Sequence, residues 1–480
     1  MSAQELLRGL EPAGVWERFS ELTRIARPPK EEAAVREHVT VWASSLGFDS
    51  SVDAEGNLVV RVPASAGREA APVVVLQSHL DMVCERDPDS EYDPRAGRIR
   101  VEVEDDWVVA PETTLGADNG IGVAAAMAVA EDPEVAHGPL ELLFTVSEEQ
   151  GLDGAKALDP SSVSGRLLLN LDGTSDTALT IGCAGSTHTF TRLRLPLQPV
   201  PDDLVVLEVA VSGARGGHSG GDIAKGRVNA IKALGRVLGR TPLRLARLEG
   251  GVSRNALPRE ARAIVAVRAE DELREAAERE LVAIREQYAG TDDGLALSIE
   301  RVGREDAADE ATSAWVLDLL AGTPSGVLAM SAALPEKVET STSLNVATTE
   351  DGVLTLASMT RSANARALDD VVASIEAAAR LAGADVEVKR SYPPWRPDLD
   401  SRLLDVAKAT FARLFDVEPG LEVVHGGLEC AVIGDRLPGI EMLALGPEVV
   451  GPHAPGERLS ISGTQRFYRL LAVLLDDLSR

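Results

Sequence analysis

The sequence predicts an α/β protein in which an α/β domain with a mostly parallel sheet is interrupted by an inserted α+β domain. Short, wholly apolar runs alternate with helix-like stretches over Val73–Asp172, and strands of alternating polarity follow. Continuous apolar runs are typical of strands buried on both faces, whereas alternation is typical of an antiparallel sheet. Because the α/β pattern returns near the C-terminus, we predict one domain over 1–186 and 391–480 and an insertion over 187–390. Three consecutive domains would fit the same pattern.

The first domain contains four apolar segments that meet polar residues at their ends. In chain order these are VVVLQSHLD, VAAAMAVAED, LELLFTVSEE and RLLLNLDG. In α/β sheets the crossover helices cover both faces, and ligands bind beyond the carboxyl ends of the strands. The polar residues of this domain gather at those predicted ends.

The insertion is predicted from strands such as HTFTRLRLPL, LVVLEVAVSG and VLTLASMTRS. Helices are predicted over 223–238 and in ALDDVVASIEAAARLAG. Proline punctuation at Tyr392–Trp395 ends this pattern. The run GIEMLALGP and two helices, LLDVAKATFARLF and RFYRLLAVLLDDL, then complete the first domain.

The composition is that of an ordinary globular protein with an acidic surplus. Of 480 residues, 44% are hydrophobic, and 76 acidic against 48 basic side chains leave a formal net charge of −28. This charge repels phosphate backbones and anionic lipids, so we expect neither nucleic acid nor a membrane surface as a partner. Three scattered cysteines, Cys84, Cys183 and Cys430, predict no disulfide framework. Since no export signal or membrane span is recognisable, we expect a cytoplasmic protein.

Ligand-type side chains occupy the ends of the predicted elements. His79 and Asp81 lie two residues apart, so on a strand both side chains face the same side. Asp118 lies in a glycine-flanked turn before an Ala-rich helix, where a helix cap is the alternative interpretation. Glu148 and Glu149 are adjacent carboxylates, which repel each other unless they are solvated or neutralised.

Asp172 ends a further apolar run and completes the set. One histidine and several carboxylates form a mixed nitrogen and oxygen ligand set suited to Zn, Mn or Co. The carboxylates are too many for one ion, and a bridging carboxylate can hold two cations about 4 Å apart. Asp118 is the best candidate for this bridge. Each residue alone would also fit a structural role, but together they predict two divalent metal ions.

Over nearly its whole length the chain resembles the zinc metallopeptidases and deacylases that include carboxypeptidase G and the aminoacylases. Within this family it is most similar to the bacterial aminoacyl-histidine dipeptidases. The motifs that carry the resemblance are HLDMVCE, TTLGADNGIG, SEEQGLDGA, NLDGT, GGHSGGDI, HGGLEC and GPHAPGERL. The resemblance implies a metal-binding catalytic domain and an inserted lid domain that also dimerises.

The resemblance also implies roles for matching residues. The implied metal ligands are His79 and Asp172 for one ion and Glu149 and His453 for the other, with Asp118 as the bridge. Asp81 is expected to orient His79 and so to raise the basicity of that ligand. Glu148 is expected to be the general base, which takes a proton from the attacking water and passes it to the leaving amine.

Further residues are implied to contact the substrate. His218, in GGHSGGDI, is expected to stabilise the oxyanion, often from a partner subunit, so a homodimer is expected; a helix-entry loop is the alternative. Arg361 is a candidate for binding the substrate's terminal carboxylate, and a surface salt bridge is its alternative role. Asn255 matches a lid asparagine but also fits a turn before proline. His425 and Glu429 are candidates for reading the substrate's amino end.

The residues and the resemblance together predict an enzyme, a dinuclear metallo-dipeptidase for dipeptides with a free amino terminus, of the aminoacyl-histidine type. We expect zinc as the metal, with Mn or Co as alternatives. Asp172 favours this interpretation, because carboxypeptidases and deacylases of the family tend to have Glu there. The alternatives are an N-acyl amino acid deacylase or carboxypeptidase and a non-catalytic metal-binding or partner-binding protein. The last is disfavoured because Glu148 and all five ligands are present.

Overall fold

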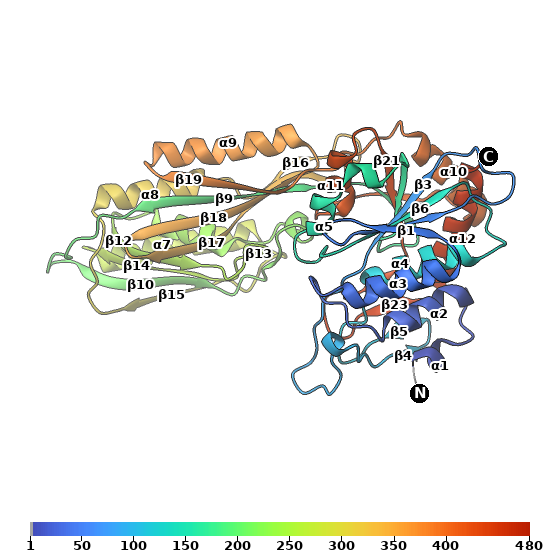
Figure 1. Ribbon diagram of the computed structural model, residues 1–480. Helices are drawn as coiled ribbons and strands as arrows, with labels where there is room; N and C mark the ends of the chain where they lie inside the picture. The colour runs from blue at the N-terminus through green and yellow to red at the C-terminus, as the bar shows by residue number, and fades with distance from the viewer. Residues whose placement is uncertain (1–2) are drawn as a thin grey trace. The chain divides into compact units, whose positions relative to one another are not determined.

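The computed structural model describes residues 3–480 (Figure 1). The chain forms two compact units. Unit 1 extends to Gly182 and resumes over Pro397–Val423 and Leu428–Arg480. Unit 2 consists of Cys183–Arg396 and Val424–Gly427. The chain therefore leaves unit 1 for one long insertion before it returns.

Unit 1 is built on an eight-stranded sheet in the order β1-β2-β6-β3-β7-β21-β8-β20. Its strands are β1 (Asp49–Val52), β2 (Leu58–Val62), β3 (Val74–His79), β6 (Leu140–Thr145), β7 (Leu167–Asn170), β8 (Ala178–Cys183), β20 (Gly420–Val424) and β21 (Glu441–Ala444). The four central strands, β6, β3, β7 and β21, are parallel, whereas β1, β2 and β8 pair antiparallel at the flanks. This sheet is thus parallel at its centre, where the apolar runs predicted it.

Helices and a small second sheet complete unit 1. The helices are α1 (Ala3–Leu7), α2 (Ala13–Leu22), α3 (Ala33–Ser45), α4 (Ala117–Glu131), α5 (Asp153–Ala157), α10 (Arg402–Phe415), α11 (Glu429–Arg436) and α12 (Ile461–Leu478). The small sheet contains β4 (Glu102–Glu104), β5 (Trp107–Val109), β22 (Val449–Val450) and β23 (Arg458–Ser460). In Figure 1, α2, α3 and α4 lie on one side of the large sheet. The helix α4 is apolar on all sides and almost wholly buried, because it packs between α2 and β3.

Unit 2 is a nine-stranded antiparallel sheet in the order β15-β10-β14-β12-β17-β18-β9-β19, with β16 also paired to β17. Its strands are β9 (Gly185–Arg194), β10 (Val205–Ser212), β12 (Arg244–Gly250), β14 (Ala261–Val267), β15 (Ala296–Arg301), β16 (Gly326–Met330), β17 (Val338–Glu350), β18 (Val353–Ser362) and β19 (Asp385–Tyr392), with the short pair β11 (Gly217–His218) and β13 (Ala256–Leu257) beside them. The helices are α6 (Ala230–Leu238), α7 (Glu270–Gln287), α8 (Glu310–Gly322) and α9 (Ala365–Leu381). One continuous apolar core joins this sheet to α6, α7 and α8.

The helix predicted over 223–238 begins later than expected. Ile223–Lys225 forms a single 3-10 turn, which ends because Gly226 adopts a left-handed φ of 62°. The helix α6 starts at Ala230, where the Asn229 side chain accepts a hydrogen bond from the backbone N–H of Ile231 at 3.1 Å. The prediction of a helix is therefore confirmed only for the second half of its range.

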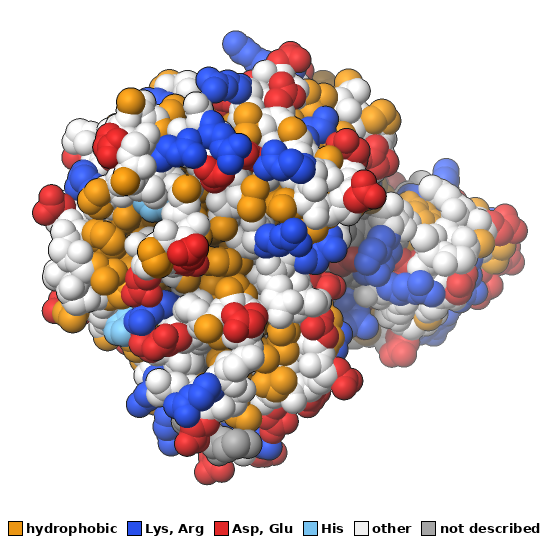
Figure 2. Space-filling model, turned by 90° about the vertical axis from the view of Figure 1, so that its right-hand side faces the viewer, with side chains coloured by type: hydrophobic (Ala, Val, Ile, Leu, Met, Phe, Trp, Pro, Cys, Tyr) orange, Lys and Arg blue, Asp and Glu red, His pale blue; other side chains and the backbone are white. Residues whose placement is uncertain are grey.

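The surface carries both signs of charge. On the face of unit 1 that Figure 2 turns toward the viewer, basic and acidic side chains lie interspersed among apolar ones. Among residues 3–480, every helix is too short or too polar to cross a bilayer.

Candidate metal centre and active site

The central strands of unit 1 end at one edge of the sheet and place polar residues together there. His79 is the last residue of β3, and Glu148 and Glu149 follow the end of β6. Asp172 follows the end of β7. Because these strands are parallel neighbours, their carboxyl ends meet at the same edge. Asp118 joins them from the first turn of α4.

Asp118 lies between two groups of potential ligands. Its Oδ1 is 3.0 Å from His79 Nε2, which in turn is 3.7 Å from Asp172 Oδ1. Its Oδ2 is 3.2 Å from His453 Nε2, and the same nitrogen is 3.1 Å from Glu149 Oε2. The two oxygens of one carboxylate thus belong to two different clusters, as a bridging ligand requires.

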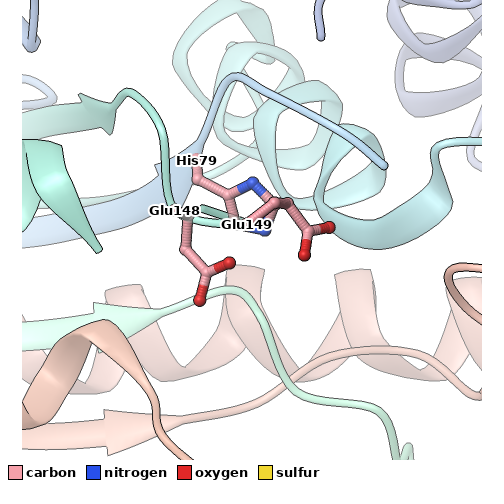
Figure 3. A group of neighbouring side chains, drawn as sticks. All are labelled: His79, Glu148 and Glu149. Carbon is pink, nitrogen blue, oxygen red and sulfur yellow. The ribbon is translucent and has the colours of Figure 1, made fainter. Parts of the chain in front are cut away.

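The clusters are tight enough for metal ions. In each of three groups, one donor atom per residue lies within 4.8 Å of the others. The groups are His79 with Asp118 and Asp172, Asp118 with Glu149 and His453, and His79 with Glu148 and Glu149. Figure 3 shows that the carboxylates of Glu148 and Glu149 point apart from each other beside the His79 ring. The two adjacent glutamates can therefore serve different purposes.

Burial and mutual repulsion perturb these groups strongly. Burial and the neighbouring Asp118 carboxylate raise the pKa of Asp172 to about 7. Burial opposes ionisation of Asp118 as well, but hydrogen bonds from His453 and His79 hold the pKa of Asp118 well below its usual range. Hydrogen bonds to Asp118 and Glu149 raise the pKa of His453 to about 11. The carboxylates of the centre thus outnumber its two histidines, and the surplus negative charge is unfavourable without a cation.

The residues fit divalent cations. The buried Oε1 of Glu149 has no hydrogen-bond partner among residues 3–480, although a buried carboxylate oxygen normally has one. The donors are imidazole nitrogens and carboxylate oxygens, which suit Zn, Mn and Co rather than a thiolate-seeking ion. A cation there would satisfy the unpaired oxygen and offset the surplus negative charge.

Asp81 contacts more than the histidine it was expected to orient. Its Oδ1 is 3.5 Å from His79 Nδ1, which is nearer, at 3.1 Å, to the Asp81 backbone oxygen. The carboxylate accepts hydrogen bonds from the backbone N–H groups of Glu148 and Glu149 at 3.0 and 3.1 Å. Asp81 therefore holds the turn that carries both glutamates. Sequence spacing could not reveal this contact, because the turn follows a different strand.

Glu148, which is half-buried, and Glu429, which is buried, both have raised pKa values. Burial raises the pKa of Glu148 well above its usual range, and it raises the pKa of Glu429 to about 7. The Oε2 of Glu429 accepts hydrogen bonds from Gln77 at 2.5 Å and Thr145 at 2.7 Å, whereas its Oε1 has no partner among the described residues. Gln77 also accepts a hydrogen bond from Asn170 at 2.6 Å. The motifs did not indicate this network. It joins Glu429 to side chains at or near the carboxyl ends of β3, β6 and β7.

Arg361 and His425 lie together in unit 2. The guanidinium of Arg361 is buried, donates to the Tyr392 hydroxyl at 3.1 Å, and leaves Nε without a partner among residues 3–480. Burial and the charge of Arg361 lower the pKa of His425 to about 4. His425 Nε2 forms a hydrogen bond with Ser341 Oγ at 2.7 Å. These surroundings favour an anion and oppose an ammonium group, so they do not support reading of the substrate's amino end by His425.

His218 is exposed in the glycine-rich loop of unit 2. Its Nδ1 accepts hydrogen bonds from the backbone N–H groups of Gly220 and Gly221, the latter at 3.0 Å. Burial of part of the ring and the charge of Arg361 lower the pKa of His218. The proton of the neutral ring is therefore assigned to Nε2, which leaves a free donor. Asn255 is also exposed, and its backbone oxygen accepts a hydrogen bond from Ser219 N at 2.7 Å.

Three buried charged residues around the centre were missed by the sequence reasoning. Arg27, Glu32 and Glu457 each bind backbone groups of the loops that carry site residues. Arg27 and Glu32 lie outside the motifs that carry the resemblance, and Glu457 lies within GPHAPGERL, where only His453 has an implied role. Their burial is the feature that distinguishes these three charges. A single sequence does not display burial, so it gave no signal for them.

Comparisons with known proteins identify the family and the fold of the chain. The model of peptidase family M20/M25/M40 matches residues 75–477. The chain is 36% identical to the cytosol non-specific dipeptidase of Escherichia coli over 98% of its own length and 99% of that protein. Its structure matches an aminoacylhistidine dipeptidase from Vibrio alginolyticus with a TM-score of 0.91 and 34% identity, covering 98% of this chain and 97% of that one. The aminopeptidase PepT of Bacillus cereus shares the fold with a TM-score of 0.58 and 18% identity, covering 98% and 100% of the two chains.

Proposed function

Because the chain belongs to peptidase family M20/M25/M40, we propose that it is a metal-dependent dipeptidase for dipeptides with a free amino terminus, of the aminoacyl-histidine type. The observation that carries the proposal is the Asp118 carboxylate, whose two oxygens face two separate ligand clusters. Similarity over the whole chain to two dipeptidases supports the same activity. We assign catalysis to unit 1 and the roles of lid and dimer contact to unit 2.

Two divalent cations would be held by unit 1. One would bind His79 and Asp172, the other Glu149 and His453, with Asp118 shared. We propose zinc, with Mn or Co as the alternatives that the same donors accept. When bound, such ions polarise a peptide carbonyl and make water more acidic. Asp81 keeps the Glu148 and Glu149 turn in register with these ligands.

Glu148 is the proposed general base. Its carboxylate lies beside His79 and points away from that of Glu149, so we assign to it the transfer of protons. It would accept a proton from the attacking water and deliver it to the nitrogen of the leaving amine. His218, with its proton on Nε2, would donate to the carbonyl oxygen as negative charge develops there.

The ends of the dipeptide would be bound by groups of opposite charge. Arg361 is proposed for the terminal carboxylate, because its buried Nε is unpaired among residues 3–480 and the hydrogen-bonded pair of His425 and Ser341 beside it is uncharged. Glu429 is proposed for the ammonium group, because its buried Oε1 is unpaired. Asn255 is proposed as a further lid contact near His218. We also propose a cytosolic protein and, from the resemblance, a homodimer, and the mass of the native protein in solution tests the dimer.

The substrate class is tested by hydrolysis of β-Ala-His, Gly-His, Ala-Ala and N-acetyl-Ala. Each assay is run on the purified chain, after chelation, and after readdition of Zn, Mn or Co. We expect chelator-sensitive cleavage of the free-amine dipeptides, fastest with histidine. Cleavage of N-acetyl-Ala alone would assign the chain to the deacylases, and no cleavage with any metal would reject the enzymatic proposal.

The division of roles between base and bridge is tested by two substitutions. Glu148→Ala should retain both metal ions but lose turnover by about 10²–10⁴-fold, the usual contribution of a general base. Asp118→Ala should lose metal as well as turnover, because both clusters share that carboxylate. Metal content measured by mass spectrometry separates the two variants. Equal loss of metal in both would contradict the assignment.

A further inference from the structure

Two fully buried charged residues, Arg27 and Glu457, contact the loop that precedes Asp118. Both are about 1% exposed. Neither is a potential metal ligand, because neither belongs to any of the three ligand groups. Charged side chains are almost never buried to this extent unless they are paired or hydrogen-bonded. The hydrogen bonds of Arg27 and Glu457 therefore indicate their role.

Glu457 binds four consecutive backbone N–H groups. Its Oε2 accepts from Leu115 at 2.7 Å and Gly116 at 3.0 Å, and its Oε1 accepts from Ala117 at 2.8 Å and Asp118 at 3.3 Å. These N–H groups have no acceptor within α4, because they lie at its start. One carboxylate thus fixes the whole backbone segment that ends at Asp118.

Glu457 also couples this segment to the second histidine. It lies four residues after His453, whose Nε2 contacts Asp118 Oδ2 and Glu149 Oε2. The loop 453–457 therefore holds Asp118 at two points, through the His453 ring at the carboxylate and through Glu457 at the backbone. A shift of Glu457 would therefore change the position of Asp118 relative to His453.

Arg27 connects the Asp118 loop to the His79 loop. Its Nη2 donates to the backbone oxygen of Gly116 at 2.6 Å, and its Nη1 donates to those of Leu80 and Asp81 at 3.0 Å each. The planar guanidinium presents these donors in a fixed arrangement, which a lysine ammonium cannot reproduce. Arg27 thus sets the spacing between the segments that carry His79 and Asp118.

The glycines of the Asp118 loop leave room for this guanidinium. A Cβ at Gly116 would lie 2.5 Å from Arg27 Nη2, and one at Gly120 would lie 2.6 Å from the same atom. Gly116 also has a left-handed φ of 71°. The sequence of the loop is therefore matched to Arg27, although Arg27 lies before residue 75, where the family match begins.

We propose that Arg27 and Glu457 are positioning residues that hold Asp118 at the place where its two oxygens can bind two metal ions. This inference rests on the proposed metallo-dipeptidase function. The groups that ligate a metal depend on outer contacts for their orientation, and loss of such contacts typically lowers metal affinity about 10–100-fold. Arg27 and Glu457 act on the backbone of the bridging ligand, so both metal sites should weaken together.

The test measures metal affinity and thermal stability on the full chain. Zn²⁺ is titrated into the chelated protein in competition with a chromophoric chelator, and the Tm of the metal-free protein is recorded. The variants are Glu457→Gln, which retains shape but only one acceptor oxygen, and Arg27→Lys, which retains charge but loses the fork. Each should lower Zn²⁺ affinity at both sites about tenfold or more.

Matched controls separate positioning from general stability. Glu141 is also buried, and its carboxylate accepts from the backbone N–H groups of Ser164 and Gly165, but it lies near the start of β6, away from the metal edge. Arg436 donates to the backbone oxygen of Leu158. Glu141→Gln and Arg436→Lys should lower Tm as the test variants do while leaving Zn²⁺ affinity within about twofold of the unmodified chain.

The outcomes distinguish this inference from the proposed function. Unchanged Zn²⁺ affinity in both Glu457→Gln and Arg27→Lys would overturn the positioning role while the unmodified chain still binds metal and cleaves dipeptides. A loss of affinity that merely follows Tm, equal to that of the control variants, would overturn it as well. Failure of the unmodified chain to bind Zn²⁺ would instead reject the metal-dependent function itself.

Discussion

At the scale of single residues, buried polar atoms without a hydrogen-bond partner indicate where a ligand binds. The Oε1 atoms of Glu149 and Glu429 and the Nε atom of Arg361 are all buried and unpaired among residues 3–480. A buried unsatisfied polar atom costs about 1–3 kcal/mol, so it persists where a ligand completes the hydrogen bonding. Two of these atoms are anionic and one is cationic, which suits a metal ion, an ammonium group and a carboxylate.

Arg361 provides the clearest prediction for substrate affinity. Arg361→Lys retains the charge but replaces a two-pronged donor by a single ammonium group. We expect KM for a dipeptide to rise about 10–100-fold, because a hydrogen bond to a charged group contributes about 1.5–3 kcal/mol. The value of kcat should change less than KM, since the terminal carboxylate takes no part in breaking the peptide bond. Steady-state kinetics with Gly-His measure both constants.

The amide of the same dipeptide supplies the control for Arg361. It has no terminal carboxylate, so Arg361→Lys and the unmodified chain should cleave it with equal kcat/KM. Arg366→Lys, at an exposed position on α9, should behave as the unmodified chain with both substrates. If Arg361→Lys impaired the amide and the free dipeptide equally, the carboxylate role would be wrong.

At the scale of elements, the strand ends were predictable and the contacts between loops were not. The apolar runs that end at His79 and Asn170 identify β3 and β7, and burial on both faces follows from their composition. The antiparallel flanks of the sheet were not foreseen, because pairing direction depends on connections elsewhere in the chain. Likewise, Arg27 and Glu457 bond to backbone atoms, and backbone partners leave no pattern in the side-chain sequence.

The turn after β6 shows a similar dependence on a distant residue. Ser147, which precedes Glu148, has a left-handed φ of 51°, an uncommon conformation for a residue other than glycine. Glu32 is buried and stabilises the turn, because its Oε1 accepts from Ser147 N at 2.8 Å and Ser147 Oγ at 3.1 Å. The same oxygen accepts from Lys30 N at 2.9 Å. Glu32 thus holds one side of this turn, and Asp81 holds the other.

Glu32→Ala should therefore destabilise the chain and misplace the base. We expect the free energy of unfolding to fall by about 1–3 kcal/mol, because the buried N–H of Ser147 loses its acceptor. The value of kcat should fall as well, because the turn that carries Glu148 loses one of its two supports. Urea denaturation and steady-state kinetics test this. Glu31→Ala is the matched control, since Glu31 is exposed and a surface substitution usually changes stability by less than about 0.5 kcal/mol. Equal effects of the two substitutions would contradict the role given to Glu32.

At the scale of the whole molecule, the two units contain different functional residues. The five candidate ligands, His79, Asp118, Glu149, Asp172 and His453, all belong to unit 1. Unit 2 contains the residues proposed for the oxyanion and the carboxylate, His218 and Arg361. Chains with several domains often unfold in more than one step, so stability is best assigned unit by unit.

Metal removal should therefore affect the two units unequally. A ligand that binds only the folded state stabilises it by RT ln(1 + [L]/Kd), which is about 2.7 kcal/mol when the free ion is at 100 times its Kd. We expect chelation to lower the unfolding temperature of unit 1 and to leave that of unit 2 in place. Differential scanning calorimetry with and without Zn²⁺ gives both transitions.

Tryptophan fluorescence assigns the transitions, because Trp16, Trp42 and Trp107 lie in unit 1 and Trp315 and Trp395 in unit 2. In a Trp315→Phe, Trp395→Phe double variant, fluorescence reports unit 1 alone, and its midpoint should rise with Zn²⁺. Adding Asp118→Ala should abolish that rise, because the shared ligand is lost. A Zn²⁺-dependent shift that survives Asp118→Ala would show that the stabilising ions bind elsewhere and would contradict the ligand set built around this carboxylate.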